Sequence, residues 1–457
     1  MSTKPPQPSL IKLFPLLGEK NANLRTEMLA GLTTFLTMAY IIAINPSILS
    51  ETGMDAGALV TGTCLAAALG CFLMGFLANL PFGLASGMGL NAFFAYSVVL
   101  AYDIPWHVAL AAIFLEGIIF ILLTACKVRE AVVNAIPINM KLAVTGGIGL
   151  FIAFLGLING SIVTADESTL VSLNQFALPA VVACLGVVVI AALDKRGVRG
   201  AILIGIALCS IVAWGYALIA PEAAAALGIT LPEGLIKFES VAPIAGKIDF
   251  SYLLHPTQLS NFLVILLTFL FVDFFDTVGT LVGVCSKANM LDENGNVPNA
   301  GRALMADALA TTAGACLGVS TVTTYVESST GVSVGGRTGY TAVTVGVLFL
   351  VAMFFSPVFV AIPSCATAPA LIYVGYLMLS AVKDINFSDI TEGLPAFVTI
   401  LAMPLTYSIG DGLTLGVLSY VALNLLYNLL APTDKRKKIS PVMIVLAVLF
   451  ILKLIFI

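Results

Sequence analysis

The chain consists of long apolar runs separated by short polar junctions. Most runs approach the length of about 20 residues that a helix needs to cross a bilayer. The pattern predicts fourteen spans, near residues 27–49, 58–79, 82–101, 107–126, 138–158, 176–193, 200–219, 258–285, 302–318, 325–336, 339–361, 366–382, 393–409 and 412–430. A further apolar run, 441–457, is either a fifteenth span or a helix in the membrane interface. Six apolar residues within 10–17 predict a short interfacial helix before the first span.

The composition supports this pattern. Of 457 residues, 59% are hydrophobic and only 10% are charged, whereas a soluble domain carries about 25% charged residues. A soluble chain of this composition would lack a polar surface. The expected fold class is therefore an all-α polytopic membrane protein.

The positive charges gather at alternate junctions. One set of junctions carries Lys127, Arg129, Lys141, Lys195, Arg196, Arg199, Lys287, Arg302, Arg337, Lys383 and the basic run 435–438. The other set carries acids without Lys or Arg, except for the long stretch 221–255. Cytoplasmic loops are enriched in Lys and Arg, and long loops cross regardless of charge. The N-terminus is therefore expected in the cytoplasm.

The two halves of the chain resemble each other. Residues 63–75 are similar to 308–320, and the tripeptide AIP opens both the fifth and the twelfth spans. With seven spans per half, the second repeat must be inverted, an arrangement typical of transporters that bind substrate at the midplane. Chance similarity between Ala- and Gly-rich helices is the alternative.

Two spans at corresponding places are poor helices. The third contains a proline and three glycines within 81–89, and in the tenth the stretch Ser320–Tyr325 alternates β-branched and small polar residues. Non-helical backbone at membrane depth survives only where it lines a cavity or is buried in protein. These segments are therefore the candidate binding site, and kinks without a ligand are the alternative.

Three acids lie in apolar surroundings. Asp273 and Asp276 fall within 260–285, and Glu327 lies in the break of the tenth span. A charge at the centre of a spanning helix costs roughly 2.5–3.5 kcal/mol, so such groups usually serve a polar ligand, an ion or a proton. Structural acids bonded to backbone amides are the alternative.

Asp273, Asp276 and Thr280 follow the spacing i, i+3, i+7 and form one polar stripe that should face the protein interior. Two carboxyl groups this close repel, so one is expected to hold its proton. We therefore assign proton coupling to Asp273, Asp276 and Glu327. Glu116 and Asp307, the latter near the cytoplasmic end of its span, are expected to be structural or supporting residues.

Metal chemistry is not indicated. The eight cysteines form no CxxC pair, and the two histidines lie near outer junctions. No metal site and no cofactor are expected, apart from the proton as coupling ion.

Four motifs resemble the purine branch of the nucleobase–cation symporter-2 family. They are GMGLNAFFAY (87–96), GGIGLFIAFLGL (146–157), VDFFDTVGTLVG (272–283) and TTYVESSTGVSVGGRTG (323–339). The resemblance covers essentially the whole chain. It implies two inverted seven-span repeats divided into a core domain and a gate domain, with short strands in spans 3 and 10 and substrate between them.

The resemblance also implies the divisions of the chain. These are a cytoplasmic N-terminal segment (1–26), the first half of the core (27–127), the first half of the gate (138–219), an extracytoplasmic loop (220–257), the second half of the core (258–361), the second half of the gate (366–430), and a basic segment with a terminal apolar helix (431–457).

By motif position, the resemblance assigns substrate binding to Glu327 with its neighbour Ser328, to Asp276 and Thr280, and to Asn91. Uracil carriers of the wider family have a histidine where Thr280 stands, which argues against uracil. No residue is expected to be catalytic.

The implied activity is proton-coupled uptake of purine nucleobases across the plasma (bacterial inner) membrane by alternating access. The implied partners are a purine, protons, the lipid bilayer and a second copy of the chain in a homodimer through the gate domains, and no nucleic acid. The Asp273–Asp276 pair is typical of guanine and hypoxanthine carriers, whereas adenine relatives often have asparagine at the position of Asp273. Guanine and hypoxanthine are favoured, and adenine is the alternative.

Two other classes remain as alternatives. A magnesium-dependent membrane transferase could use Asp273 and Asp276 on a diphosphate, but it would need nearby basic residues, and none is closer than Lys287. An anion exchanger or channel would require positive charge at the half-helix tips instead of three acids.

Overall fold

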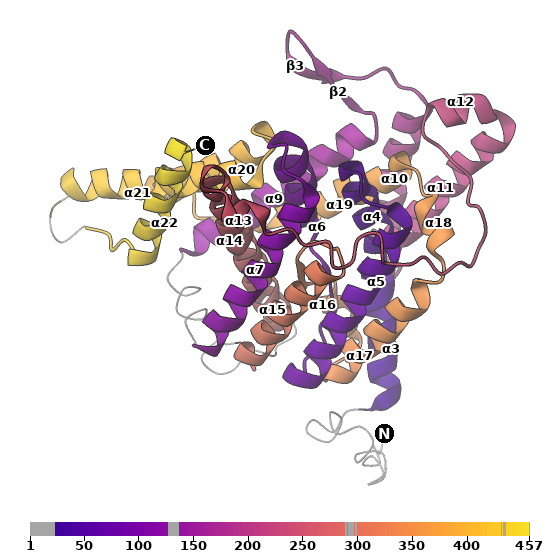
Figure 1. Ribbon diagram of the computed structural model, residues 1–457, viewed down its shortest axis with the longest axis horizontal. Helices are drawn as coiled ribbons and strands as arrows, with labels where there is room; N and C mark the ends of the chain where they lie inside the picture. The colour runs from indigo at the N-terminus through magenta and orange to yellow at the C-terminus, as the bar shows by residue number, and fades with distance from the viewer. Residues whose placement is uncertain are drawn as a thin grey trace.

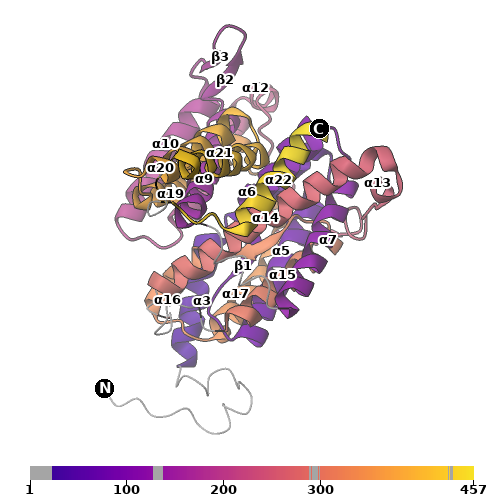
Figure 2. The same ribbon diagram turned by 90° about the vertical axis from the view of Figure 1, so that its left-hand side faces the viewer.

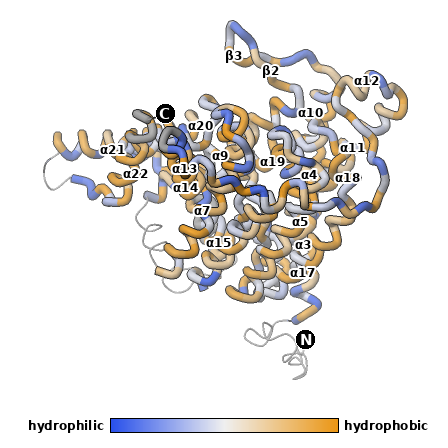
Figure 3. The backbone as a smooth tube through the Cα atoms, in the orientation of Figure 1, coloured by the Kyte–Doolittle hydropathy of each residue, from blue (hydrophilic) through white to orange (hydrophobic). Residues whose placement is uncertain are grey.

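The computed structural model describes residues 23–126, 137–287, 290, 297, 299–430, 432 and 436–456 (Figure 1). The interfacial helix expected in 10–17, and most of the N-terminal segment 1–26, lie outside these residues. Figure 3 shows that the helices are mostly apolar, while hydrophilic residues gather in the connecting segments.

Each expected span has a helical counterpart. The first half contains α3 (Leu24–Met38), α4 (Ile41–Leu49), α5 (Ala56–Leu73), α6 (Met88–Ala92), α7 (Trp106–Ala125), α9 (Ile138–Asn159), α10 (Leu178–Lys195), α11 (Ala201–Ile219) and α12 (Pro221–Ala226). The second half contains α13 (Ser251–Leu254), α14 (Pro256–Lys287), α15 (Ala300–Cys316), α16 (Ser328–Val334), α17 (Gly339–Ala352), α18 (Ser356–Val360), α19 (Ser364–Leu379), α20 (Ile390–Leu405), α21 (Ile409–Leu430) and α22 (Pro441–Phe456).

Short irregular helices extend several of these elements. They are η1 (Ser50–Thr52), η2 (Met74–Ala78), η3 (Phe93–Ala101) and η4 (Ser380–Asp384). Within the described residues, eight helical segments are long and apolar enough to cross a membrane, and five shorter apolar helices accompany them. The all-α polytopic fold class is confirmed.

The helices pack as two sets, which Figure 2 shows side by side. In one set, α7 and α5 contact α15, α17 contacts α3 and α5, and α14 contacts α7. In the other, α9 packs against α19 and α20, and α10 and α11 pack against α19. These sets correspond to the expected core and gate, although the assignment of those roles and their exact boundaries stays a prediction.

The strands expected in the third and tenth spans are present. β1 (Leu84–Ser86) pairs antiparallel with β4 (Val322–Thr324), in the register Leu84 opposite Thr324 and Ser86 opposite Val322. All of their residues are buried. Pairing satisfies backbone groups that have no water to bond at this depth. Each strand leads directly into a short helix, α6 after β1 and α16 after β4.

Neighbouring helices approach both strands closely at glycines. A Cβ added at Gly70 of α5 would lie 3.0 Å from Leu84 Cβ, and one added at Gly314 of α15 would lie 2.8 Å from Val322 Cγ2. A larger residue at Gly314 would collide with β4, so the small residue is what lets α15 cover the strand.

A second pair of strands forms a hairpin between α9 and α10. β2 (Val163–Asp166) pairs antiparallel with β3 (Leu170–Leu173), and the turn is closed by Asp166 Oδ1, which accepts hydrogen bonds from the amides of Ser168 and Thr169 at 2.9 and 3.0 Å. The hairpin projects from the helical body in both views (Figures 1 and 2).

The long polar segment between α12 and α13 lies along the first set of helices (Figure 1). The amide of Lys237 donates to the Phe354 carbonyl at 2.9 Å, and the amide of Gly246 donates to the Cys316 carbonyl at 2.8 Å. Ile244, which belongs to this segment, is fully buried. This segment is therefore attached to the core helices along much of its length.

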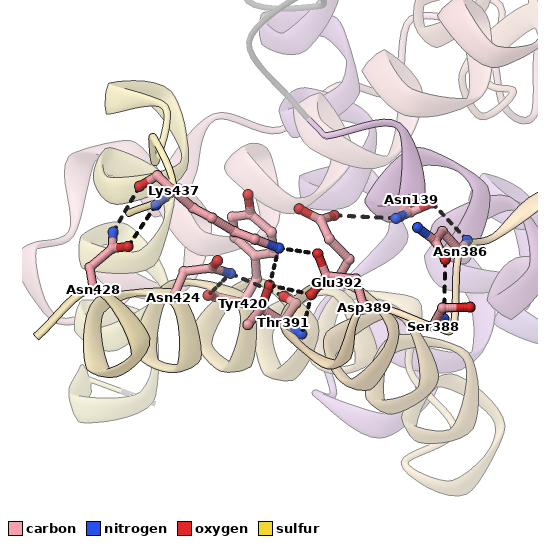
Figure 4. A network of polar contacts seen from close by, with 10 residues as sticks. All are labelled: Asn139, Asn386, Ser388, Asp389, Thr391, Glu392, Tyr420, Asn424, Asn428 and Lys437. Carbon is pink, nitrogen blue, oxygen red and sulfur yellow. Dashed lines mark hydrogen bonds and ion pairs between the residues drawn. The ribbon is translucent and has the colours of Figure 1, made fainter. Parts of the chain in front are cut away.

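Helix α22 lies against both sets. Its Phe450 ring meets Phe271 of α14 with centroids 6.0 Å apart, and α22 also contacts α21. Just before it, the Lys437 ammonium forms an ion pair with Asp389 and donates to Thr391 Oγ1 at the start of α20 (Figure 4). Residues 441–456 are thus a packed helix, and whether it spans the membrane stays a prediction.

Candidate functional site

Glu327 lies where β4 gives way to α16. Its Oε1 accepts a hydrogen bond from the Tyr40 hydroxyl at 2.5 Å. The backbone amide of Glu327 is a second partner of this carboxylate, and the residue as a whole is partly buried. Because a carboxylate offers about four acceptor sites, the acid keeps capacity for a further hydrogen bond, just beyond the end of β4.

Asn91 lies at the corresponding end of the other strand, on α6. It is fully buried, and its Oδ1 accepts a hydrogen bond from Ser86 Oγ of β1 at 2.8 Å. Its Nδ2 has no hydrogen-bond partner among the described residues. A buried donor left unpaired costs about 1–3 kcal/mol, so an amide in this position is suited to a ligand that supplies an acceptor.

Ser328 links the two broken segments. It is fully buried, and its Oγ accepts a hydrogen bond from the amide of Gly83, just before β1, at 3.0 Å. Tyr325 makes a second link, since its hydroxyl donates to the Ser86 carbonyl at 2.5 Å. Ser328 thus fixes the position of α16 beside β1, a contact between distant segments that the sequence did not show.

The acids of α14 lie beside these segments, because α14 contacts β4, α6 and α16. Asp273 is fully buried. The side chain of Asp276 lies outside the part of the chain that the structure describes, although its backbone belongs to α14. Thr280, two turns beyond Asp273, is partly exposed.

A threonine between the stripe residues joins two of the buried acids. Thr277 Oγ1 lies 3.2 Å from Asp273 Oδ1 and 3.1 Å from Asp307 Oδ2 of α15. Asp307 is fully buried among the helices, and its expected place near the cytoplasmic end of its span stays a prediction. It stands two turns inside α15, where that helix packs in the core set.

Glu116 of α7 supports the other side of β4. It is fully buried, and its Oε2 lies 3.4 Å from the Thr321 hydroxyl, just before β4. The expected supporting role of Glu116 stays a prediction.

Sequence reasoning missed Tyr40 and Thr277. Tyr40 stands in the aliphatic run between α3 and α4, where its only sequence signal is a phenol among aliphatic neighbours. Thr277 lies four residues after Asp273, a spacing that places both on one helix face. That spacing could have included it in the polar stripe.

Comparison with known proteins gives a consistent picture. A model of the Permease family, of the xanthine/uracil type, matches residues 25–414. A permease of Methanocaldococcus jannaschii is 45% identical over 437 residues, which cover 95% of both chains. Adenine permease AdeP of Escherichia coli is 42% identical, covering 96% of this chain and 95% of the relative. Guanine/hypoxanthine permease PbuG of Bacillus subtilis is also 42% identical, covering 98% and 100%.

Solved structures share the fold at much lower identity. The transmembrane domain of the cyanobacterial bicarbonate transporter BicA superposes with a TM-score of 0.63 at 16% identity, covering 86% of this chain and 97% of that one. The murine Slc26a9 anion transporter, in an inward-facing state, superposes with a TM-score of 0.64 at 12% identity, covering 94% and 73%. At such identity the likeness shows the fold alone.

Proposed function

The chain belongs to the xanthine/uracil permease family, and on that premise we propose that it takes up purine nucleobases by alternating access. The observation that carries the proposal is the pairing of β1 with β4, because the segments that follow these two broken-span strands carry a carboxylate, Glu327, and a buried amide, Asn91, whose Nδ2 has no partner among the described residues. A purine offers both N–H donors and ring or carbonyl acceptors, which are the hydrogen-bonding groups that a carboxylate and an amide N–H respectively require.

Family membership identifies the chain as a multi-pass membrane transporter, so the magnesium-dependent transferase alternative is wrong. The anion-exchanger alternative has only the shared fold in its favour. Three acids near the broken helices oppose an anion by charge.

Within the purines, we favour guanine and hypoxanthine over adenine. The two kinds of relative are equally similar to this chain, so the preference rests on the Asp273–Asp276 pair. We place Glu327, Asn91, Ser328, Asp276 and Thr280 at the substrate, as the family motifs imply.

We further propose that a proton accompanies the base. Asp273 and Asp307 flank the single hydroxyl of Thr277, and one hydroxyl proton can be donated to only one acceptor at a time. Protonating one carboxyl removes a buried charge and lets it donate to Thr277 in return. A cytoplasmic N-terminus, residence in the inner membrane and a homodimer through the gate helices complete the proposal.

The test is uptake of radiolabelled guanine, hypoxanthine, adenine, xanthine and uracil in cells that lack their own carriers. We expect saturable purine uptake that unlabelled purines inhibit and inorganic anions do not. It should rise as the outside pH falls and collapse with a protonophore, without a need for sodium. Uptake inhibited by bicarbonate or sulfate but not by purines would refute nucleobase transport, whereas sodium-dependent purine uptake would refute only the proton.

A further inference from the structure

Tyr40 lies at the break in the first membrane-crossing segment, between the end of α3 at Met38 and the start of α4 at Ile41. It is fully buried in the main hydrophobic cluster. A buried phenol needs a hydrogen-bond partner, and the described chain supplies one, Glu327 Oε1 at 2.5 Å.

The packing around Tyr40 is fixed independently of this hydrogen bond. The Thr37 and Thr330 hydroxyls lie 3.0 Å apart and connect α3 to α16. A Cβ added at Gly331 would lie 2.6 Å from the Ala30 carbonyl oxygen, so the two helices are in close contact. The relative position of α3 and α16 is thus set by packing and does not depend on the hydrogen bond of the Tyr40 hydroxyl.

The hydrogen bond from Tyr40 instead affects the orientation of the Glu327 carboxylate. With Oε1 bonded to a buried phenol, the carboxylate cannot rotate without breaking this bond, and Oε2, which offers about two lone-pair sites, keeps capacity to accept a further hydrogen bond. A carboxylate already held in one orientation loses less freedom when a ligand binds.

We propose that Tyr40 is a positioning residue, which orients Glu327 so that Oε2 accepts a hydrogen bond from a purine N–H. The inference rests on the proposed function. Tyr40 acts through Glu327 and does not itself bond the base. The assignment therefore predicts that its effect disappears once the carboxylate is removed.

The experiment measures binding of guanine, hypoxanthine and adenine to the purified full-length protein in lipid nanodiscs. Tyr40→Phe removes only the hydroxyl, and we expect the Kd to rise by about tenfold. The unfolding temperature without ligand should stay close to that of the unmodified protein. Tyr373→Phe is the matched control. The Tyr373 hydroxyl also donates to a carboxylate, Asp194 Oδ2 at 2.7 Å, but Tyr373 lies on α19, in the other helix set. It should leave the Kd unchanged.

A double-substitution cycle separates positioning from direct contact. In a Glu327→Gln background, adding Tyr40→Phe should change the Kd by less than twofold. An equal tenfold loss in both backgrounds would overturn the proposal, because Tyr40 would then act without Glu327. Unchanged binding by Tyr40→Phe alone would also overturn it, and so would a failure of this variant to fold, which would make the hydrogen bond a requirement of the fold. If the unmodified protein bound no purine at all, the proposed function itself would fail.

Discussion

Single side chains complete the hydrogen bonding of the two short strands. The Cys71 thiol of α5 lies 3.2 Å from the amide and 3.4 Å from the carbonyl oxygen of Leu84 in β1. The Thr311 hydroxyl of α15 donates to the Val322 carbonyl of β4 at 2.9 Å. At membrane depth no water can replace these partners. The strands that frame the candidate site therefore depend on individual residues of the helices behind them.

Replacing Thr311 with valine keeps the shape and leaves the buried Val322 carbonyl without this donor. We expect a loss of about 1–3 kcal/mol in stability, seen as a lower unfolding temperature of the purified protein. Thr312→Val is the control, because the Thr312 hydroxyl donates to a carbonyl of its own helix, that of Ala308 at 2.8 Å, and not to β4. Equal effects of the two substitutions would contradict the role of Thr311.

At the scale of elements, α22 is held at its start by a polar network and along its length by packing. Asn428 of α21 exchanges two hydrogen bonds of 2.8 Å with the backbone of Lys437, whose ammonium pairs with Asp389 (Figure 4). The hydrogen bond from Lys437 holds the pKa of the Asp389 carboxyl below its usual value of 3.8. Both side chains are about one-third exposed, so solvent screens the pair and limits its worth to about 0–1 kcal/mol.

Because the folded-state pKa of Asp389 is depressed, the pair stabilises the anchor above the unfolded value of 3.8 and loses this effect as the pH falls through the lower folded value. Lys437→Met should therefore speed hydrogen exchange in α22 at pH 7 and make little difference well below pH 3.8. Lys383→Met on η4 removes a positive charge elsewhere and should have no such effect. An unchanged exchange rate at neutral pH would show that packing alone holds α22.

At the scale of the whole molecule, the described chain passes between the two helix sets through few connections. These are the long segment between α12 and α13, the short turn between α18 and α19, and α22. The long segment is bonded to the core helices at Lys237 and Gly246. Alternating access, as proposed above, requires the two helix sets to move relative to each other, and we expect the exposed residues that follow α12, before Lys237, to accommodate that movement.

The orientation of the molecule can be tested on α12 itself. Ala225 is exposed, whereas its neighbour Ala224 is fully buried. With a cytoplasmic N-terminus, Ala225→Cys should react with a membrane-impermeant maleimide in intact cells, and Ala224→Cys should react only after unfolding. The reactivity of the native cysteines in the unmodified chain sets the background. Reaction of Ala225→Cys only in permeabilised cells would reverse the topology.

The sequence alone determined that the chain lies in a lipid bilayer, and it located most of the helical spans. Apolar runs of membrane-spanning length, and the cost of charge in lipid, are local properties of composition, so the spans could be predicted. The breaks in the third and tenth spans were also local, since glycine, proline and β-branched residues disfavour a continuous helix there. The cost of charge in lipid likewise identified Glu327 and Asp273 as unusual residues, whereas Asn91 entered through the resemblance to the family.

Only the tertiary structure decided which groups meet. Tyr40 and Glu327 are 287 residues apart in the chain, Gly83 and Ser328 are 245 apart, and Thr277 and Asp307 come from different helices. The hairpin between α9 and α10 and the anchoring of α22 likewise depend on pairing across segments. Hydrogen bonds act over about 3 Å between specific atoms, and a residue pattern along the chain carries no information on which distant atoms come within that range. The sequence therefore located the polar groups, and the packing of the helices selected their partners.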